Sequence, residues 1–212
     1  MQNTGGTMTD KNDLVYLASR SPRRRELLIQ IGVTFQLLNF RGPPREDAEI
    51  DEAVLPGESG RDYAGRVARA KAEFGWKLVA ERRLPALPVL AADTTVVAQG
   101  RILGKPVDRK DAAAMLALLS GRSHVVLTAV ALRHAGGTEF ALSESEVRFR
   151  ELGAEEIDHY VASGDADDKA GAYGIQGMAA RFIPEIRGSY SGIMGLPLYE
   201  TATLLSRLDT SR

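Results

Sequence analysis

The sequence has 212 residues, 44% of them apolar, with 27 Lys+Arg against 28 Asp+Glu, three His and no Cys. This length suits one domain or two small, closely packed ones, and the apolar fraction is large enough to build a core. The near-neutral charge excludes a broad polyanion-binding surface, and the missing cysteines exclude disulfides, thiolate nucleophiles and iron–sulfur clusters.

The first 13 residues are polar and contain glycine. We expect residues 1–13 to form a disordered extension and residues 14–212 to form a single domain. The start of the chain lacks a basic segment followed by an apolar run, and no apolar stretch is long enough to span a membrane. We therefore expect a cytoplasmic protein without a membrane partner.

Strand and helix patterns alternate through the amino-terminal half. Leu14 to Ala18 is typical of a strand, and Ser21 can cap a following helix that has Pro22 in its first turn and Gly32 as its terminator. The pattern then predicts a strand over 33–40, a long loop over 41–60 and a helix that is capped by Ser59 and ends near 82–83. It next predicts strand segments over 89–92 and 95–98, followed by a hairpin turn at 99–100 into a strand at 102–103.

The carboxyl-terminal half continues this alternation. The predicted elements are a helix over 112–119 capped by Asp108, a buried strand over 125–132 that turns at 136–137 into a partner over 139–149, a helix over 154–163, a weak strand over 183–186 and a final helix over 198–208. Residues 164–195 hold seven glycines and are expected to be mostly loop. The pattern predicts an α/β fold with some antiparallel pairing.

Four arginines within six residues surround the start of the first predicted helix, over 20–25. A helix amino terminus favours an anion, and the guanidinium fork matches phosphate geometry. One interpretation is therefore a phosphate site. The other is a solvated helix start whose arginines pair with Glu26 and other surface acids.

Asp93 and Thr94 follow an apolar strand pattern, and Glu52 ends an acidic tract over 46–52. Ligands of α/β sheets tend to lie outside the carboxyl ends of strands, where a carboxylate can hold a divalent ion or activate water. Mg²⁺ takes one or two carboxylates together with substrate phosphates and water. A turn-forming aspartate and a solvated acidic loop are the plainer interpretations.

Two of the six lysines, Lys105 and Lys169, lie beside glycine or proline in constrained settings. Each is either a phosphate contact or an exposed loop lysine. Tyr173 and Gln176 could stack on and hydrogen-bond a base, although an isolated Tyr173 is more often a core residue. His124 joins a helix end to a strand and is interpreted as structural.

Common catalytic motifs are missing. The sequence contains no G-x-x-x-x-G-K-[ST], no G-x-G-x-x-G, no H-E-x-x-H and no G-x-S-x-G. Walker-type kinases, dehydrogenases, zincins and serine hydrolases therefore lose their main sequence support.

Six segments, taken together, form a specific pattern. They are LASRSPRRRELL at 17–28, RVARAKA at 66–72, ADT at 92–94 through GKP at 104–106, LSGRSH at 119–124, DKAGAYGIQG at 168–177, and GSY at 188–190 through GLP at 195–197. In this order, they resemble the Maf family of nucleoside triphosphate pyrophosphatases over nearly all of 14–205. The departures are the polar extension, an insertion between Phe35 and Glu52, and Gly192 where an Asn is frequent.

The resemblance implies an α/β fold of the Maf/ITPase-like type, with a long central mixed β-sheet flanked by helices, two lobes with a cleft between them, and a homodimer. It also implies hydrolysis of a nucleoside triphosphate between the α- and β-phosphates with a divalent metal (Mg, Mn or Co). Carried over to this chain, the catalytic residues would be Asp93, Lys105 and Glu52, with Asp93 and Glu52 holding the metal. The substrate-binding residues would be Ser19, Arg23, Arg24, Lys71, Thr94, Lys169 and Gln176.

Within that family the chain resembles the branch that acts on dTTP and UTP, including modified pyrimidine forms. Arg23, the triplet at 92–94, and Lys169 with Gln176 agree on this assignment. The alternatives are a 7-methyl-GTP pyrophosphatase and a non-catalytic nucleotide-binding regulator of septum formation. A nucleic-acid-binding module is a weaker hypothesis, because the chain lacks the positive charge that it would need.

Overall fold

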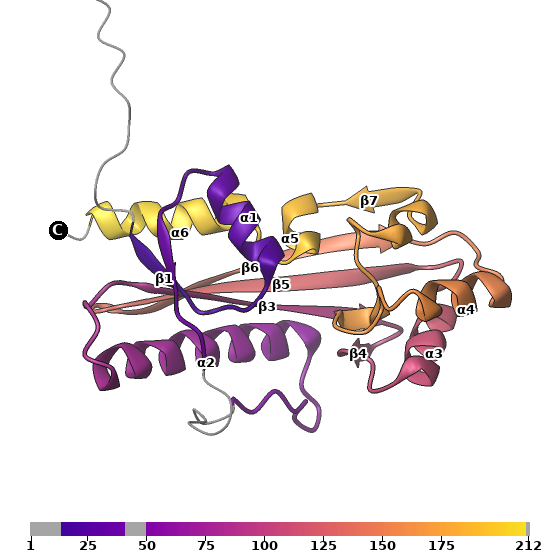
Figure 1. Ribbon diagram of the computed structural model, residues 1–212, viewed down its shortest axis with the longest axis horizontal. Coiled ribbons are helices and arrows are strands. Elements are labelled where there is room, and N and C mark those ends of the chain that lie inside the picture. The colour runs from indigo at the N-terminus through magenta and orange to yellow at the C-terminus, as the bar shows by residue number, and fades with distance from the viewer. Residues whose placement is uncertain (1–13, 41–49, 211–212) are drawn as a thin grey trace, which may run out of the picture.

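The computed structural model describes residues 14–40 and 50–210 (Figure 1). The predicted extension over 1–13 and most of the insertion between Phe35 and Glu52 lie outside the described residues. No helix in the described part of the chain combines the length and the apolar character needed to span a bilayer.

A seven-stranded mixed sheet forms the centre of the molecule. Its strand order is β2-β1-β3-β5-β6-β7, with β4 paired to β3. Only the β1–β2 and β1–β3 pairs are parallel. The strands are β1 (Val15–Leu17), β2 (Phe35–Leu37), β3 (Val89–Ala98), β4 (Arg101–Leu103), β5 (Ser123–His134), β6 (Gly137–Arg148) and β7 (Glu185–Arg187). The predicted α/β fold with a long mixed sheet is confirmed.

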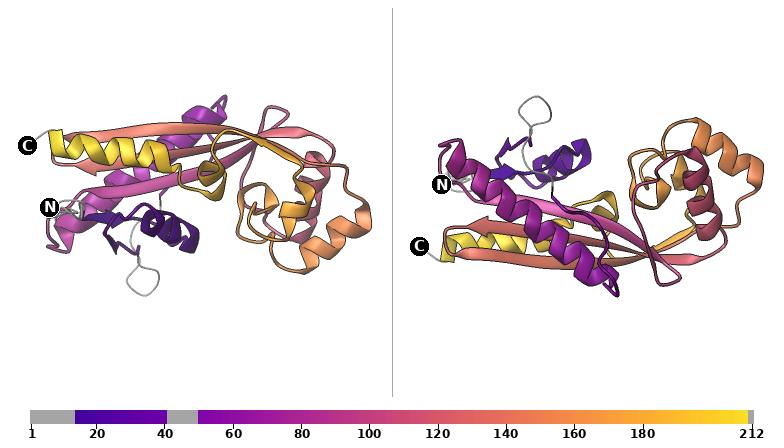
Figure 2. Two further views of the ribbon diagram at one scale, coloured as in Figure 1. Left: turned by 90° about the horizontal axis from the view of Figure 1, so that it is seen from above. Right: turned by 90° about the horizontal axis from the view of Figure 1, so that it is seen from below.

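Helices flank the sheet in two lobes that share β3, β5 and β6 (Figures 1 and 2). In the first lobe α2 (Gly60–Glu81) covers one face, and α1 (Pro22–Gln30) and α6 (Leu198–Thr210) cover the other. The core of the second lobe includes residues of α3 (Arg109–Leu119), α4 (Ala154–Ala162), α5 (Tyr190–Met194) and the 3₁₀ turns η1 (Ala170–Ala172) and η2 (Met178–Phe182).

The predicted helix caps are confirmed. The hydroxyl of Ser21 accepts a hydrogen bond from the backbone N–H of Arg24, and Ser59 and Asp108 cap α2 and α3 in the same way. Gly32 follows α1 with φ at +73°, a conformation that glycine adopts without strain. These starts and stops agree with local capping chemistry.

Several boundaries differ from the sequence prediction. Residues 89–98 form one continuous strand, because the backbones of Asp93 and Thr94 stay in the ladder opposite Ala129 and Thr128 of β5. The strand predicted over 33–40 has only three residues, and the one over 183–186 is shifted to 185–187. The glycine-rich segment 164–195 contains η1, η2, β7 and α5, so it is less irregular than predicted.

A gap in the sheet beside β3 positions the cavity described next. β1 pairs with β3 only at Val89 and Leu90, and β4 pairs with it only from Val96 onward. Between these points β3 pairs with a strand on one side only, and that strand is β5. Asp93 therefore lies in the middle of its strand, and the strand that ends at the cavity is β1, which leads directly into Ser19 and α1.

Candidate active site

A cavity of about 690 Å³ lies at this gap, between the two lobes. Its walls come from the end of β1 and the start of α1, from the middle of β3, from the β4–α3 connection and from the segments 168–175 and 193–195. Among the described residues, six basic side chains line it against three acidic ones. The basic residues are Arg20, Arg23, Arg24, Lys71, Lys105 and Lys169, and the acidic ones are Glu52, Asp93 and Asp168. The cavity thus concentrates positive charge in a chain that is nearly neutral.

Lys71 brings two carboxylates together on the α2 side of the sheet. Side chains alternate along β3, so Asp93 faces α2 and Thr94 faces the side of α1. The ammonium Nζ of Lys71 lies 2.8 Å from Oδ1 of Asp93 and 2.8 Å from Oε1 of Glu52. Asp93 is 6% exposed, whereas half of the Glu52 side chain is exposed. The arrangement forms a compact cluster in which one carboxylate is buried and one faces solvent.

The same two carboxylates fit a divalent cation. Their oxygens already converge on one positive charge, and oxygen ligands are what Mg²⁺ prefers. Within the described ranges, no group of three or more His, Asp or Glu side chains could hold a metal ion. A cation bound by Asp93 and Glu52 would therefore need further oxygens from water or from a phosphorylated ligand.

Arg24 connects three separate parts of the cavity wall. Its Nε donates to the carbonyl of Gly195 at 2.8 Å, and its two terminal nitrogens donate to Ser19 Oγ and Thr94 Oγ1, both at 3.3 Å. Burial lowers the pKa of Arg24, and the nearby carboxylates of Asp93 and Glu52 oppose that shift. The planar guanidinium group of Arg24 thus links α1, β3 and the α5–α6 turn.

Thr94 continues this network into the protein core. Its hydroxyl lies 3.0 Å from that of Thr128, which in turn lies 2.8 Å from the carbonyl of Gly192. A carbonyl only accepts, so the single proton of Thr128 goes to Gly192 and Thr94 donates to Thr128. The oxygen of Thr94 then accepts a hydrogen bond from Arg24. Every group in this series of hydrogen bonds therefore has a partner.

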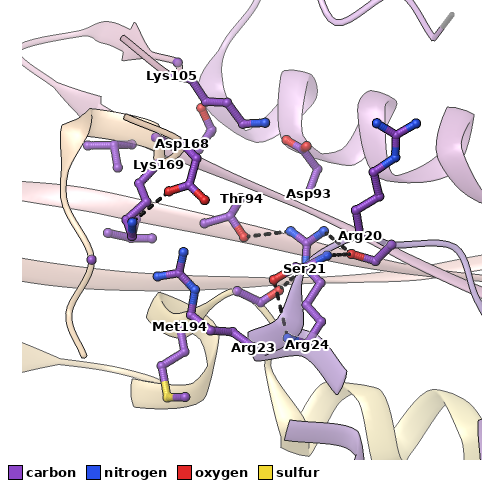
Figure 3. Close-up of a pocket in the computed structure, with 18 of the residues that line it drawn as sticks. Arg20, Ser21, Arg23, Arg24, Asp93, Thr94, Lys105, Asp168, Lys169 and Met194 are labelled. Atoms are coloured by element: carbon purple, nitrogen blue, oxygen red, sulfur yellow. Dashed lines mark hydrogen bonds and ion pairs between the residues drawn. The ribbon is translucent and has the colours of Figure 1, made fainter. Parts of the chain in front are cut away.

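Lys169, Arg23 and Lys105 differ in whether an acidic side chain pairs with their positive charge (Figure 3). Lys169 pairs with Asp168 at 2.7 Å and with Asp165 at 3.3 Å. Arg23 and Lys105 point into the cavity from opposite sides and have no hydrogen bond or ion pair among the described residues. These two cations are the ones most open to an anionic ligand.

Tyr173 and Gln176, the two residues considered for contact with a base, lie in different surroundings. Tyr173 lines the cavity from a buried position, where its hydroxyl lies 2.7 Å from Nε2 of His124 and its ring packs edge-on against Phe149. Gln176 is exposed and does not line the cavity, although Gly174 does. His124 is buried among these rings, in agreement with its structural interpretation.

Arg20, Tyr63 and Asp168 also line the cavity, although they were not among the predicted site residues. Arg20 and Asp168 belong to the segments that carry the family resemblance, so their neighbours were a usable signal. Tyr63 is a buried residue of α2. Its hydroxyl donates to the backbone carbonyl of Glu52 at 3.1 Å, a contact that no local pattern could indicate.

Comparison with known proteins finds relatives that match nearly the whole chain. A dTTP/UTP pyrophosphatase of Dechloromonas aromatica is 60% identical over 194 residues, which cover 92% of this chain and 96% of the relative. Proteins of the same name from Aromatoleum aromaticum and Nitrosomonas europaea are 62% and 52% identical, covering 90% and 96% of this chain and 93% and 99% of the relatives.

Structural and family comparisons cover the same region. The Staphylococcus aureus Ham1 protein superposes with a TM-score of 0.49 at 13% identity, over 94% of this chain and all of the Ham1 chain. The family model described as Maf-like protein matches residues 14–208. With almost the whole described chain inside that match and relatives above 50% identity along it, the chain belongs to the Maf family.

Proposed function

We propose that this chain is a nucleoside triphosphate pyrophosphatase that converts dTTP and UTP to the monophosphate and pyrophosphate. The observation that carries the proposal is the cluster in which Lys71 bridges Asp93 and Glu52 beside the uncompensated Arg23 and Lys105. The names of the relatives supply the two bases, and the Maf family supplies the reaction class.

The charge distribution supports binding of a triphosphate. A triphosphate carries several negative charges, and in the described part of the chain basic side chains outnumber acidic ones two to one around the cavity. The amino terminus of α1 adds backbone N–H groups and the positive end of a helix dipole. Arg23 and Lys105 would therefore contact phosphate oxygens without first breaking an ion pair.

Asp93 is the residue best placed to accept a proton from an attacking water. One of its oxygens accepts a hydrogen bond from Lys71, which fixes the carboxylate in place and leaves the other oxygen for water. The water oxygen forms a bond to the α-phosphorus, the bond between that phosphorus and the bridging oxygen breaks, and pyrophosphate leaves with the electron pair. When bound, a divalent cation (Mg, Mn or Co) neutralises phosphate charge and polarises the phosphoryl oxygens.

Hydrolysis in ¹⁸O-labelled water tests this reaction. The purified protein is incubated with Mg²⁺ or Mn²⁺ and, separately, dTTP, UTP, CTP, dCTP, GTP, ATP and 7-methyl-GTP. We expect turnover of dTTP and UTP with the label in the monophosphate, because attack occurs at the α-phosphorus. Release of orthophosphate and diphosphate, or a lack of turnover of every nucleotide, contradicts the proposal.

The same panel decides between the alternatives. Turnover of 7-methyl-GTP in preference to dTTP and UTP supports the other branch of the family. Binding of nucleotide without products supports a non-catalytic regulator. The homodimer remains a prediction that follows from the sequence resemblance, and the cytoplasmic location remains a prediction from the composition of the sequence.

A further inference from the structure

Arg66 on α2 holds the chain segment that carries Glu52. Its terminal nitrogens donate to the backbone carbonyl of Asp51 at 3.2 Å and to that of Ala53 at 2.8 Å. These two carbonyls belong to the residues on either side of Glu52. A single side chain therefore binds the backbone immediately before and immediately after the acidic residue of the cavity.

Glu58 orients the guanidinium group of Arg66 toward the two carbonyls. Its two carboxylate oxygens accept hydrogen bonds from Arg66 at 2.6 and 2.9 Å, and one of them also accepts from the backbone N–H of Leu55 at 3.0 Å. The Glu58 side chain is only 7% exposed, and the hydrogen bonds from Arg66 lower its pKa to about 2. A bidentate pair of this kind restricts both side chains more than a single contact would.

Few other contacts fix the segment among the described residues, and one of these is local, from the backbone N–H of Ala53 to Oδ1 of Asp51 at 2.9 Å. Residues 50–55 belong to neither a helix nor a strand, so no regular ladder restrains their backbone. Tyr63 adds one hydrogen bond, to the carbonyl of Glu52 itself. The exposed Glu52 side chain thus depends on Arg66 and Tyr63 for its place beside Lys71.

The helix α2 carries both Arg66 and Lys71, the lysine that pairs with Glu52. Arg66 and Lys71 both belong to α2, but Lys71 lines the cavity and Arg66 does not. We propose that Arg66 is a positioning residue that keeps Glu52 beside Lys71 and Asp93 and thereby sets the affinity of this cluster for a divalent cation. The catalytic consequence of this inference depends on the proposed function, whereas the structural part does not.

The test uses Arg66→Gln, Arg66→Lys, Glu52→Gln and the double variant Arg66→Gln/Glu52→Gln. Arg61→Gln is the matched control, because Arg61 lies on the same helix and pairs only with the exposed Glu144 in the described structure. Hydrogen–deuterium exchange of the full chain without nucleotide is measured over 50–58. We expect at least tenfold faster exchange there in Arg66→Gln and no change in Arg61→Gln.

Metal binding gives the second readout. Mn²⁺ is titrated calorimetrically in the presence of the α,β-methylene analogue of dTTP, which cannot be hydrolysed at the scissile position. Loss of a residue that orients a metal ligand typically costs 10- to 100-fold in metal affinity, and we expect roughly a tenfold loss here. In the Glu52→Gln background the additional effect of Arg66→Gln should be less than twofold, because the ligand that it positions is already gone.

Each outcome decides one statement. Unchanged exchange over 50–58 overturns the clamp, and independent, multiplicative effects of the two substitutions overturn its action through Glu52. If the wild type hydrolyses no nucleotide, the proposed function fails while the exchange experiment still decides the clamp. If Arg66→Gln does not fold, Arg66→Lys replaces it, since one ammonium cannot make all of the contacts of the guanidinium.

Discussion

Lys71 donates a hydrogen bond from Nζ to Oδ1 of Asp93 over 2.8 Å, which joins α2 to the middle of β3. The contact places an ammonium group against a nearly buried carboxylate, and pairing of this kind offsets the cost of removing polar groups from water. It also leaves Asp93 rigidly aimed at the cavity.

Asp93→Asn should abolish the proposed proton transfer. An amide retains the shape of the side chain and can still accept from Lys71, but it cannot take a proton from water. We expect kcat to fall about 10²- to 10⁴-fold, as for removal of a general base, with a thermal unfolding midpoint close to that of the wild type. Asp158→Asn, on the exposed face of α4, is the control; near-normal turnover by Asp93→Asn would exclude the assigned role.

Arg24→Lys should damage both stability and substrate binding. An ammonium cannot reach Gly195, Ser19 and Thr94 at once in the geometry of the guanidinium fork. We expect a loss of about 1–3 kcal/mol in the free energy of unfolding, measured by urea denaturation, together with a raised KM. Arg25→Lys at the neighbouring position should change neither quantity. Equal behaviour of the two variants would contradict the connecting role of Arg24.

Thr128→Val tests the hydroxyl chain beneath Thr94. Valine has nearly the shape of threonine, but it leaves the hydroxyl of Thr94 and the carbonyl of Gly192 without their shared partner. Leaving buried polar groups unpaired costs about 1–3 kcal/mol of unfolding free energy. Thr128→Ser keeps the hydroxyl and should recover most of that loss. A valine variant as stable as the wild type would show that the chain is not required.

His124 should make folding stability depend on pH. Burial lowers the pKa of His124 to about 4 from its ordinary 6.5, and the rings of Phe149 and Tyr173 surround it. Between these values the unfolded chain binds the proton and the folded chain does not, so stability is complete above pH 6.5 and falls toward pH 4. The shift corresponds to about 3 kcal/mol.

His124→Gln removes the titration while keeping a polar partner for Tyr173. We expect its unfolding free energy, measured by urea denaturation at several pH values, to change less between pH 6.5 and pH 4 than that of the wild type. Parallel curves for the two proteins would assign the dependence to other groups.

Features decided by neighbouring residues could be predicted from the sequence. The caps Ser21, Ser59 and Asp108 each bond to a backbone N–H three residues later, so the pattern of a few residues indicates them. The hairpin of β5 and β6 follows in the same way from two strand-like runs and the glycines between them.

Features decided by distant segments could not be predicted. The place of Asp93 within an open stretch of β3 depends on where β1 and β4 stop pairing. The use of Arg24 to bind the carbonyl of Gly195 joins positions 171 residues apart. The sequence indicated that Asp93 and Arg24 belong to the candidate site. Only the folded structure shows that Arg24 links separate parts of the cavity wall.

The shared strands limit how the cavity can open. The β3–β5 ladder is continuous from Val89 opposite Arg133 to Val97 opposite Val125, and the β5–β6 ladder continues it sideways. A hinge between the lobes would have to bend three hydrogen-bonded strands at the same point. An opening of the cavity that leaves these ladders unbent would therefore have to come from side chains such as Arg23 and Lys105 and from the segment 168–175.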